Sequence, residues 1–351
     1  MKNVCLRKHV LRQWIPFAVL CLLVEMSAGL CAQTANPPKP WPIRAVIIAT
    51  FPGEYQLWGE REKLTETIDL PGVALPLHTN AEHTVLAMVS GTTLINSAAS
   101  VMVLGLDPRF DLTHAYILIN GIAGVDPEDA SIGSAAWADF VVGDVMREVD
   151  LREAPANWPY GFFLIGANAP NMGASRASEN VFALNAKLTE WAFQQTKDLK
   201  LLDDPDAAPL RAAYTNYPNA QRPPFVLIGD TFASDHYWHG KILNQFANDW
   251  VKLNTGGKGN FVMTEMEDSG FMSSLAKLDA IHRVDLHRVM VLRTGSNYSM
   301  QPSGSAAVQS VSAHYVGGGR IAEESAWLCG STVLHKILGN WGKYYDHIPG
   351  E

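Results

Sequence analysis

Acidic side chains at two places in the chain could take part in acid–base chemistry. Glu54 follows residues 44–50 (RAVIIAT), a β-branched apolar run that predicts a buried strand. A carboxyl group just past such a strand can have a raised pKa and serve as a general base, or it can be an ordinary acid of a surface loop. Glu265 and Glu267 stand where a helix is expected to begin, and acids there also favour the helix dipole. The residues alone leave both interpretations open.

Other patterns suggest chemistry but lack the partners that the chemistry needs. His236 and His239 form an H-x-x-H pair, yet no Glu or further ligand completes a zinc signature. Residues 173–175 (GAS) lack the second glycine of a nucleophile elbow, and the Gly-rich residues 255–260 lack the spacing of a phosphate-binding P-loop. We therefore expect no metal site, no cofactor and no serine-hydrolase chemistry.

Motifs rich in small and polar residues follow one another in a set order. They are SGTTLINSAAS from Ser90, ILINGIAG from Ile117, IGDTF from Ile228, TEMEDSG from Thr264 and VLRTGSN from Val291. This order resembles that of the nucleoside phosphorylase superfamily, especially its adenosylhomocysteine/methylthioadenosine nucleosidase branch, over roughly residues 43–300. The shared order and spacing carry the resemblance, because each short motif alone is weak. As a whole, the chain is similar to the group of purine nucleoside permeases, which shares this architecture.

The resemblance implies a site for a sugar and for the group that attacks it. Glu267 matches the glutamate that grips the ribose 2'- and 3'-hydroxyls, a task that suits a carboxylate because its two oxygens accept two hydrogen bonds side by side. Met266 would lie under the sugar as a soft apolar surface. Glu54 matches the glutamate that positions and deprotonates the attacking water, and Arg293 and Ser90 match the remaining ligands of water or phosphate.

The resemblance also implies a site for the base. Asn297 stands where family members place the Asp or Asn that contacts purine N7, where a donor stabilises the charge left on the departing base. It is also compatible with a turn, and N-Y-S from Asn297 is a glycosylation sequon. Phe232 matches the aromatic that stacks on the base, although core packing is the commoner fate of Phe. Ile122, Ala123 and Gly124 would line the base through their backbone, or form a tight turn.

The resemblance favours hydrolysis over the other activities. Phosphorylases of this superfamily place a further arginine in the loop of Glu54 to hold phosphate, and none stands there. We expect the protein to bind a purine nucleoside and hydrolyse its N-glycosidic bond to free base and ribose, with Glu54 activating water. Because nucleosidases carry Asp where Asn297 stands, the amide shifts the preference among inosine, guanosine and adenosine towards the first two. Two alternatives stay open, namely a nucleoside-binding or transport component without catalysis and a phosphate-dependent phosphorylase.

The elements that must position these residues follow an α/β pattern. Short apolar runs predict strands at 44–50, 85–89, 116–119, 225–228 and 289–292, with antiparallel strands within 133–149. Helices are predicted at 55–64, 96–104, 178–196, 235–251 and 265–278, with two more after Ala306. The first three strands each end in a Gly-containing loop, which is where ligands bind in open α/β sheets. The resemblance implies three α/β/α layers around a mixed, mainly parallel central sheet.

The N-terminal residues predict export. Basic residues precede an apolar run at 14–30, which Glu25 interrupts and which is shorter than the ~20 apolar residues of a spanning helix. We therefore expect a signal peptide at 1–32 rather than a membrane anchor, a proline-rich lead-in at 33–42 and a single nucleoside phosphorylase-like domain at 43–351, with an insertion near 154–222. The mature chain would be periplasmic or extracellular. No later apolar run is long enough to span a membrane.

Charge and cysteine content narrow the range of partners. The formal net charge of -8 argues against a nucleic-acid backbone, which requires a basic face. Cys329 is the only cysteine certain to remain after cleavage, so no intramolecular disulfide is expected. A small neutral ligand fits this composition better. The resemblance adds that the protein can form a homo-oligomer in which neighbours complete the site.

Overall fold

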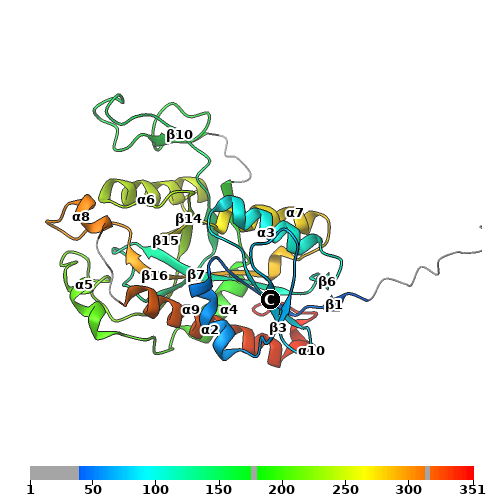
Figure 1. Cartoon of the computed structure of the whole chain (residues 1–351). Coiled ribbons are helices and arrows are strands. Elements are labelled where there is room, and N and C mark those ends of the chain that lie inside the picture. Colours follow the sequence, from blue (N-terminus) through cyan, green and yellow to red (C-terminus); the bar gives the residue numbers. More distant parts are fainter. Residues whose placement is uncertain (1–38, 175–179, 313–316) are drawn as a thin grey trace, which may run out of the picture. The chain divides into compact units, whose positions relative to one another are not determined.

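The computed structural model of the chain describes residues 39–174, 180–312 and 317–351 (Figure 1). The predicted signal peptide, residues 1–32, lies outside the described residues, as does the lead-in up to residue 38. Residues 40–351 pack as one unit. Among the described residues, none of the helices combines the length and the apolar character needed to cross a bilayer.

Strands and helices alternate through most of this unit. The strands are β1 (Trp41–Pro42), β2 (Ala45–Ala49), β3 (Glu66–Ile68), β4 (Leu77–Thr79), β5 (Val85–Val89), β6 (Phe110–Asp111), β7 (Tyr116–Val125), β8 (Ala135–Trp137), β9 (Phe140–Val142), β10 (Arg147–Glu148), β11 (Phe162–Phe163), β12 (Val181–Ala183), β13 (Val226–Ile228), β14 (Asp230–Ala233), β15 (Phe261–Glu265) and β16 (Val289–Tyr298). The α-helices are α2 (Pro52–Arg61), α3 (Leu94–Leu106), α4 (Ala186–Thr196), α5 (Ala208–Ala212), α6 (Lys241–Thr255), α7 (Asp268–Ala280), α8 (Ala307–Val311), α9 (Gly318–Gly339) and α10 (Trp341–Tyr344). Two short 3-10 helices are η2 (Pro205–Ala207) and η3 (Leu286–Arg288).

The central sheet is mixed, with a parallel middle. Its main path runs β12-β9-β14-β15-β7-β2-β5-β4-β3, and β16 joins β7 to β8, which in turn pairs with β13. Strand β2 is parallel to both β5 and β7, β7 is parallel to β16, and β15 is antiparallel to β7. Helices lie on both faces of this sheet, which gives three layers. The predicted fold class is therefore confirmed.

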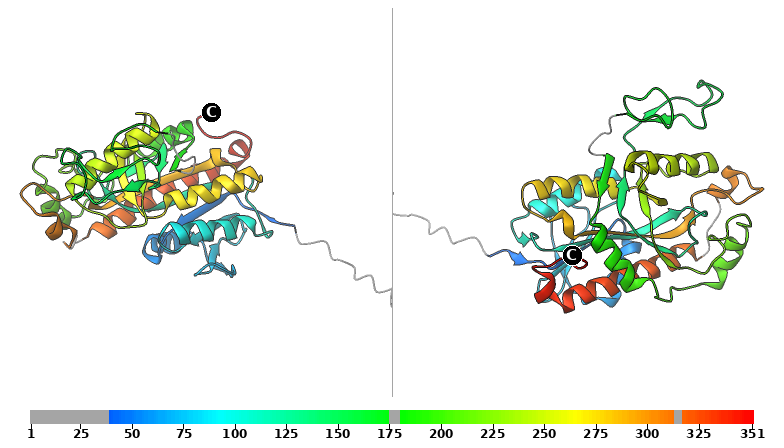
Figure 2. Two further views of the ribbon diagram at one scale, coloured as in Figure 1. Left: turned by 90° about the horizontal axis from the view of Figure 1, so that it is seen from above. Right: turned by 180° about the vertical axis from the view of Figure 1, so that it is seen from behind.

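Helices cover both faces of the sheet because its middle strands are apolar on both sides. Val46 and Ile48 of β2 pack in a core with α3 and α7, whereas Ala45 and Ile47 pack in a second core with α2, α4 and α9. Successive side chains of a strand point to opposite faces, so one unbroken apolar run serves two cores. Figure 1 and Figure 2 show α3 and α7 on one side of the sheet and α2, α4 and α9 on the other.

Several predicted boundaries were wrong. Residues 261–265 form β15, and helix α7 begins only at Asp268, whereas a helix was predicted from Glu265. A run of three apolar residues before TEME shows too little periodicity to separate a strand from a helix. Part of the helix predicted at 178–196 is strand β12, and the helix predicted at 235–251 begins at Lys241 after an irregular loop at 234–240. Within 133–149, β8 and β9 were predicted to be antiparallel strands, but each has one parallel and one antiparallel neighbour. Strand β8 is parallel to β13 and antiparallel to β16, and β9 is parallel to β14 and antiparallel to β12.

Candidate functional site

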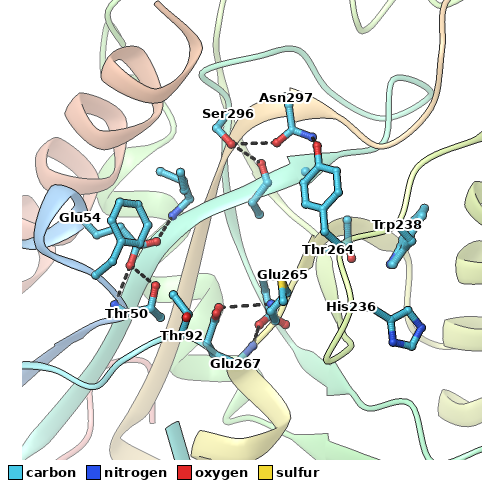
Figure 3. Close-up of a pocket in the computed structure, with 16 residues that line it drawn as sticks. Thr50, Glu54, Thr92, His236, Trp238, Thr264, Glu265, Glu267, Ser296 and Asn297 are labelled. Atoms are coloured by element: carbon cyan, nitrogen blue, oxygen red, sulfur yellow. Dashed lines mark hydrogen bonds between the residues drawn. The ribbon is translucent and has the colours of Figure 1, made fainter. Parts of the chain in front are cut away.

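A cavity of about 240 Å³ opens where the central strands reach their carboxyl ends (Figure 3). Thr50 and Phe51 follow β2, Thr92 follows β5, and the remaining walls come from the ends of β7, β15 and β16 and from the loop after β14. The carboxyl ends of the parallel strands β2, β5 and β7 lie at one edge of the sheet, and the antiparallel β15 runs alongside the end of β7, so residues far apart in the chain meet here. The predicted residues that line this cavity are Glu54, Ile122, Ala123, Gly124, Met266, Glu267 and Asn297.

Glu54 is a buried wall residue held by several hydrogen bonds. Pro52 starts α2, which places Glu54 in the first helical turn beside the end of β2. Its Oε2 accepts hydrogen bonds of 2.7 Å from both the backbone N–H and the hydroxyl of Thr50, and its Oε1 accepts one of 2.7 Å from the N–H of Ile122. A carboxylate has about four acceptor positions, so these bonds orient the group and leave it one position for a ligand.

Arg293 lies beneath the cavity wall and is fully buried. Its Nε and Nη2 donate to Asp268 Oδ1 over 3.1 and 2.5 Å, and its Nη1 donates to the carbonyl oxygen of Ile122 over 3.3 Å. Three more carboxylates, those of Glu54, Glu265 and Glu267, each approach its guanidinium to 3.7 Å. Arg293 therefore does not line the cavity, and its contribution is to hold the carboxylates in place.

Glu265 and Glu267 stand at the turn from β15 into α7. Glu265 Oε2 accepts the N–H groups of Glu267 and Asp268 over 2.6 and 2.7 Å, which satisfies donors that a helix start leaves free. The other oxygen of Glu265 is buried with no hydrogen-bond partner among the described residues. Glu267 accepts N–H groups from Thr93 and Met266, each over 3.2 Å, and faces the cavity. Thr93 has a φ of 83°, a strained value for a residue other than glycine.

Burial, together with the crowding of carboxylates, changes the pKa values of these groups. Burial raises the pKa of Glu54 above its usual value, although Arg293 and the hydrogen bonds from Thr50 act in the opposite direction. Burial, with the neighbouring Asp268, raises the pKa of Glu265 well above its usual value. Burial also raises the pKa of Glu267, against the attraction of Arg293. For Arg293, burial lowers the pKa, but the surrounding carboxylates, Asp268 first, outweigh it and raise the value, so the guanidinium stays charged.

At the other side of the cavity, amide and aromatic groups replace the carboxylates. Asn297 Nδ2 donates to the hydroxyl of Tyr237 over 3.0 Å and to the carbonyl of Tyr298 over 3.2 Å. Its Oδ1 accepts the Ser296 hydroxyl over 3.0 Å, and that hydroxyl also reaches the Ala123 carbonyl oxygen over 3.1 Å. This side is suited to a flat heteroaromatic group with hydrogen-bonding edges.

Two more predicted site residues lie outside the cavity lining. Ser90 is buried, and its hydroxyl donates to the carbonyl oxygens of Gly91 and Ala49 over 2.9 and 3.3 Å. Phe232 is buried against Phe246, with ring centroids 5.7 Å apart in an edge-on arrangement. The aromatic side chains that line the cavity are Phe51, Tyr237 and Trp238. The structure therefore does not place Ser90 or Phe232 against a ligand in this cavity, because the Ser90 hydroxyl is engaged with the backbone and Phe232 packs in an aromatic cluster.

Several lining residues were not predicted as site residues from the sequence, among them the three in the loop after β14. His236 was considered only as half of a metal pair, and Tyr237 and Trp238 stand in an irregular loop without periodicity. Asp268 belongs to the TEMEDSG motif, and its ion pair with Arg293 could have been inferred only from the fold. In the part of the chain that the structure describes, no three His, Cys, Asp or Glu side chains are arranged to hold a metal ion.

Comparison with protein families gives a match along almost the whole unit. The sequence pattern of the purine nucleoside permease (NUP) family matches residues 42–349. The chain belongs to the purine nucleoside permease family. A Schizosaccharomyces pombe protein named a probable purine nucleoside permease is 30% identical over 337 residues, covering 92% of this chain and 95% of its own. The purine nucleoside permease of Candida albicans strain SC5314 is 29% identical over 327 residues, covering 90% of this chain and 80% of its own.

Solved structures place this permease-family chain in the nucleosidase fold. A 5'-methylthioadenosine/S-adenosylhomocysteine nucleosidase of Neisseria meningitidis, solved with methylthio-immucillin-A, superposes with a TM-score of 0.51 at 14% identity, covering 84% of this chain and 99% of its own. The futalosine hydrolase of Helicobacter pylori superposes with a TM-score of 0.52 at 15% identity, and the match covers 84% of this chain and 98% of the hydrolase chain. At these identities the likeness concerns the fold, and it agrees with the resemblance of the motifs.

Proposed function

We propose that this protein hydrolyses the N-glycosidic bond of a purine nucleoside bound in the cavity between Glu54 and Asn297. The observation that carries the proposal is the arrangement of two buried carboxylates, Glu54 and Glu267, on one guanidinium at one side of a cavity that has amide and aromatic groups at the other. The carboxylate side suits the sugar and the attacking water. The amide side suits the base.

The proposed reaction divides the work among three side chains. Glu267 accepts hydrogen bonds from the ribose 2'- and 3'-hydroxyls, and Glu54 accepts a proton as a water oxygen bonds to C1'. The C1'–N9 bond breaks and its electron pair goes to the purine, while the positive charge that develops on the sugar faces carboxylates. Asn297 Nδ2 donates to N7 in place of the Tyr237 hydroxyl, and the purine takes its proton from solvent.

Electrostatics favour water over phosphate as the attacking group. Among the described residues that line the cavity there is no Lys or Arg. Arg293, the nearest guanidinium, is fully buried and engaged with Asp268. A phosphate dianion would enter a site whose nearest charges are carboxylates, and like charges at close range oppose binding. A neutral water meets no such barrier.

A Glu54→Gln substitution tests the proposal. It keeps the size of the side chain and removes the proton acceptor, so release of free purine should fall by about 100-fold or more. Binding of the nucleoside should change little. The matched control is Glu60→Gln, an exposed position on the same helix whose carboxylate accepts a hydrogen bond from Gln56, and it should keep wild-type turnover. Unchanged turnover in Glu54→Gln would contradict the proposed role of Glu54 as the proton acceptor.

Nucleoside binding without chemistry, as part of a transport system, is the second candidate function. It is favoured by the names of two relatives, since the Schizosaccharomyces pombe protein is named a probable purine nucleoside permease and the Candida albicans protein a purine nucleoside permease. It uses the same cavity and predicts that a bound nucleoside is recovered intact. Chromatography of the nucleoside after prolonged incubation with the protein distinguishes the two candidates, since hydrolysis leaves free base and ribose.

A further inference from the structure

A second cavity of about 190 Å³ lies beside the candidate site and is mainly apolar. Its walls include Met146 from the segment before β10, Phe232 of β14, and Leu243 and Phe246 from the first turns of α6. Glu148 and Ser234 are among its few polar neighbours. An apolar lining of this kind favours a hydrocarbon group over a charged or strongly hydrated one.

The two cavities share a wall. His236 and Trp238, both in the irregular loop between β14 and α6, line the first cavity as well as the second. The indole N–H of Trp238 is buried and has no hydrogen-bond partner among the described residues. A buried donor without a partner is uncommon in folded proteins. A purine offers its ring nitrogens as acceptors for such a donor, whereas a 6-amino or 6-alkylamino group is itself a donor.

This shared wall lies at the base end of the first cavity. Figure 3 shows His236 and Trp238 on the side away from Glu54, and the same loop carries Tyr237, whose hydroxyl accepts a hydrogen bond from Asn297. In a purine, N7 and the substituent at position 6 lie on one edge of the ring system. A base that presents N7 to Asn297 therefore turns its 6-substituent towards the loop and the second cavity.

We propose that the second cavity is a subsite for an apolar group on the 6-position of the purine, so that the preferred ligand is an N6-alkylated purine nucleoside. The inference rests on the proposed function, because it takes from it the placement of sugar and base. It replaces the preference for inosine and guanosine that Asn297 suggested from the sequence, because a 6-oxo group would leave the second cavity empty. Plain adenosine would fill only the first cavity, whereas an N6-alkyl chain would add apolar contacts with Leu243 and Phe246.

Calorimetry with carbocyclic nucleosides tests the subsite, since these analogues lack the glycosidic bond and are not hydrolysed. Carbocyclic N6-pentyladenosine should bind the full chain at least about tenfold more tightly than carbocyclic adenosine. Leu243→Trp, which fills the second cavity, should abolish that difference and leave the Kd of carbocyclic adenosine within about twofold of wild type. Ile242→Trp is the matched control, because Ile242 is its exposed neighbour on α6 and lines neither cavity.

Each possible result bears on the subsite directly. Equal affinity of the two analogues for the wild type overturns it, and so does a Leu243→Trp variant that weakens both alike. Met146→Trp fills the cavity from a loop instead of a helix and should reproduce the effect if Leu243→Trp does not fold. A carbocyclic 5'-pentylthio analogue gives a further outcome. If Leu243→Trp weakens the binding of this analogue but not that of carbocyclic adenosine, the second cavity belongs to the sugar end, which overturns the subsite for the 6-position. Adenosine cleavage without N6-alkyl preference overturns the subsite alone, and failure of both analogues to bind overturns the proposed function with it.

Discussion

Arg293 is surrounded by more negative charge than it can neutralise. Asp268 forms a close ion pair with it, and Glu54, Glu265 and Glu267 approach within 3.7 Å. One positive charge cannot neutralise four buried carboxylates, so burial and mutual repulsion favour the protonated form within the cluster. The raised pKa values of the three glutamates express this directly. At the scale of single residues, the surroundings of each glutamate in this cluster make its carboxyl group a weaker acid than usual.

The activity should depend on pH through Glu54. The base form is the carboxylate, and because burial raises its pKa, kcat/KM should rise with pH and reach a plateau above the usual glutamate value of 4.5. Asn297 does not titrate, so no loss of activity from that residue is expected at higher pH. Initial rates of base release across a pH series give the profile. A flat profile in the wild type would contradict Glu54 as the base.

Changing Asn297 to Asp should add an acid to the site. Its carboxyl group can give a full proton to N7, whereas the amide can only donate a hydrogen bond. Adenosine hydrolysis should increase at least about tenfold, and the pH profile should acquire a falling limb where the new acid loses its proton. Steady-state rates with adenosine and inosine measure the change. Equal rates in the variant and the wild type would mean that N7 does not face this residue.

Glu265 should make the folded state less stable as pH rises. Its pKa is raised in the folded protein, so the native state binds a proton more tightly than the unfolded chain. The free energy of unfolding therefore falls as pH increases from the usual value of 4.5 through the raised value. Glu265→Gln should reduce this slope by up to about 1.4 kcal/mol per pH unit, as measured by urea unfolding at several pH values.

An exposed glutamate provides the control for that measurement. Glu128→Gln removes an acid that lies on the surface and should leave the slope as it is in the wild type. The two variants have the same change in formal charge. If Glu265→Gln also kept the wild-type slope, Glu265 would not be the proton-binding member of the cluster.

Comparison with a family predicted several residues of the cavity, but not all those that shape it. Glu267 and Asn297 stand in motifs whose order along the chain could be compared, Glu54 matches a family glutamate, and the structure brings all three to one cavity. Trp238 has no motif, and its position depends on an irregular loop that no periodicity predicts. Phe232 lies in a matched motif, yet side-chain direction at the end of β14 places it in the neighbouring cavity.

Among the elements, the pairing of β7 with β16 positions most of the site. Both strands continue beyond their apolar runs, and their register sets Arg293 opposite Gly121 and Asn297 opposite Gly124. A Cβ on Gly121 would lie 2.2 Å from Glu54 Oε1 and 2.6 Å from Arg293 Nη1. The glycine in this strand is therefore required because the carboxylate and the guanidinium occupy the space of a side chain.

Gly121→Ala should disturb the site and the fold together. The added methyl group displaces Glu54 or Arg293, so stability should fall by about 1–3 kcal/mol and turnover should fall with it. The control is Gly319→Ala near the start of α9, where a Cβ would meet no atom within 4 Å and alanine favours the helix. Thermal unfolding and base release of both variants measure the effects. A Gly121→Ala protein with wild-type stability and turnover would contradict this tight packing.

Strand segments with a strong apolar run could be predicted, whereas the extensions of β7 and β16 into the candidate site could not. The run at 85–89 is β5 residue for residue, because five consecutive apolar residues leave little ambiguity. The extensions of β7 to Val125 and of β16 to Tyr298 contain glycine and polar residues, which favour loops in isolation. Pairing of the two extensions with each other, and of β7 with β15, overrides that local preference. Ile122, Arg293 and Asn297, three of the predicted site residues, lie in those extensions.

For the molecule as a whole, we propose export. The proposal depends on residues 1–32, whose basic start and apolar run are typical of a signal peptide. The chain recovered from the periplasm or the medium of its source should begin at Gln33. Intact-mass measurement decides the point, and a protein that keeps Met1 inside the cell would contradict it. An exported nucleosidase would act on nucleosides outside the cytoplasm.

The identity of the sugar product tests the central claim most directly. The purified protein is incubated with inosine, guanosine and adenosine, with and without phosphate, and the sugar is identified by chromatography against ribose and ribose 1-phosphate. The absence of Lys and Arg from the described cavity lining predicts free ribose at a rate independent of phosphate. Ribose 1-phosphate, or nucleoside bound tightly and recovered intact, would contradict hydrolysis.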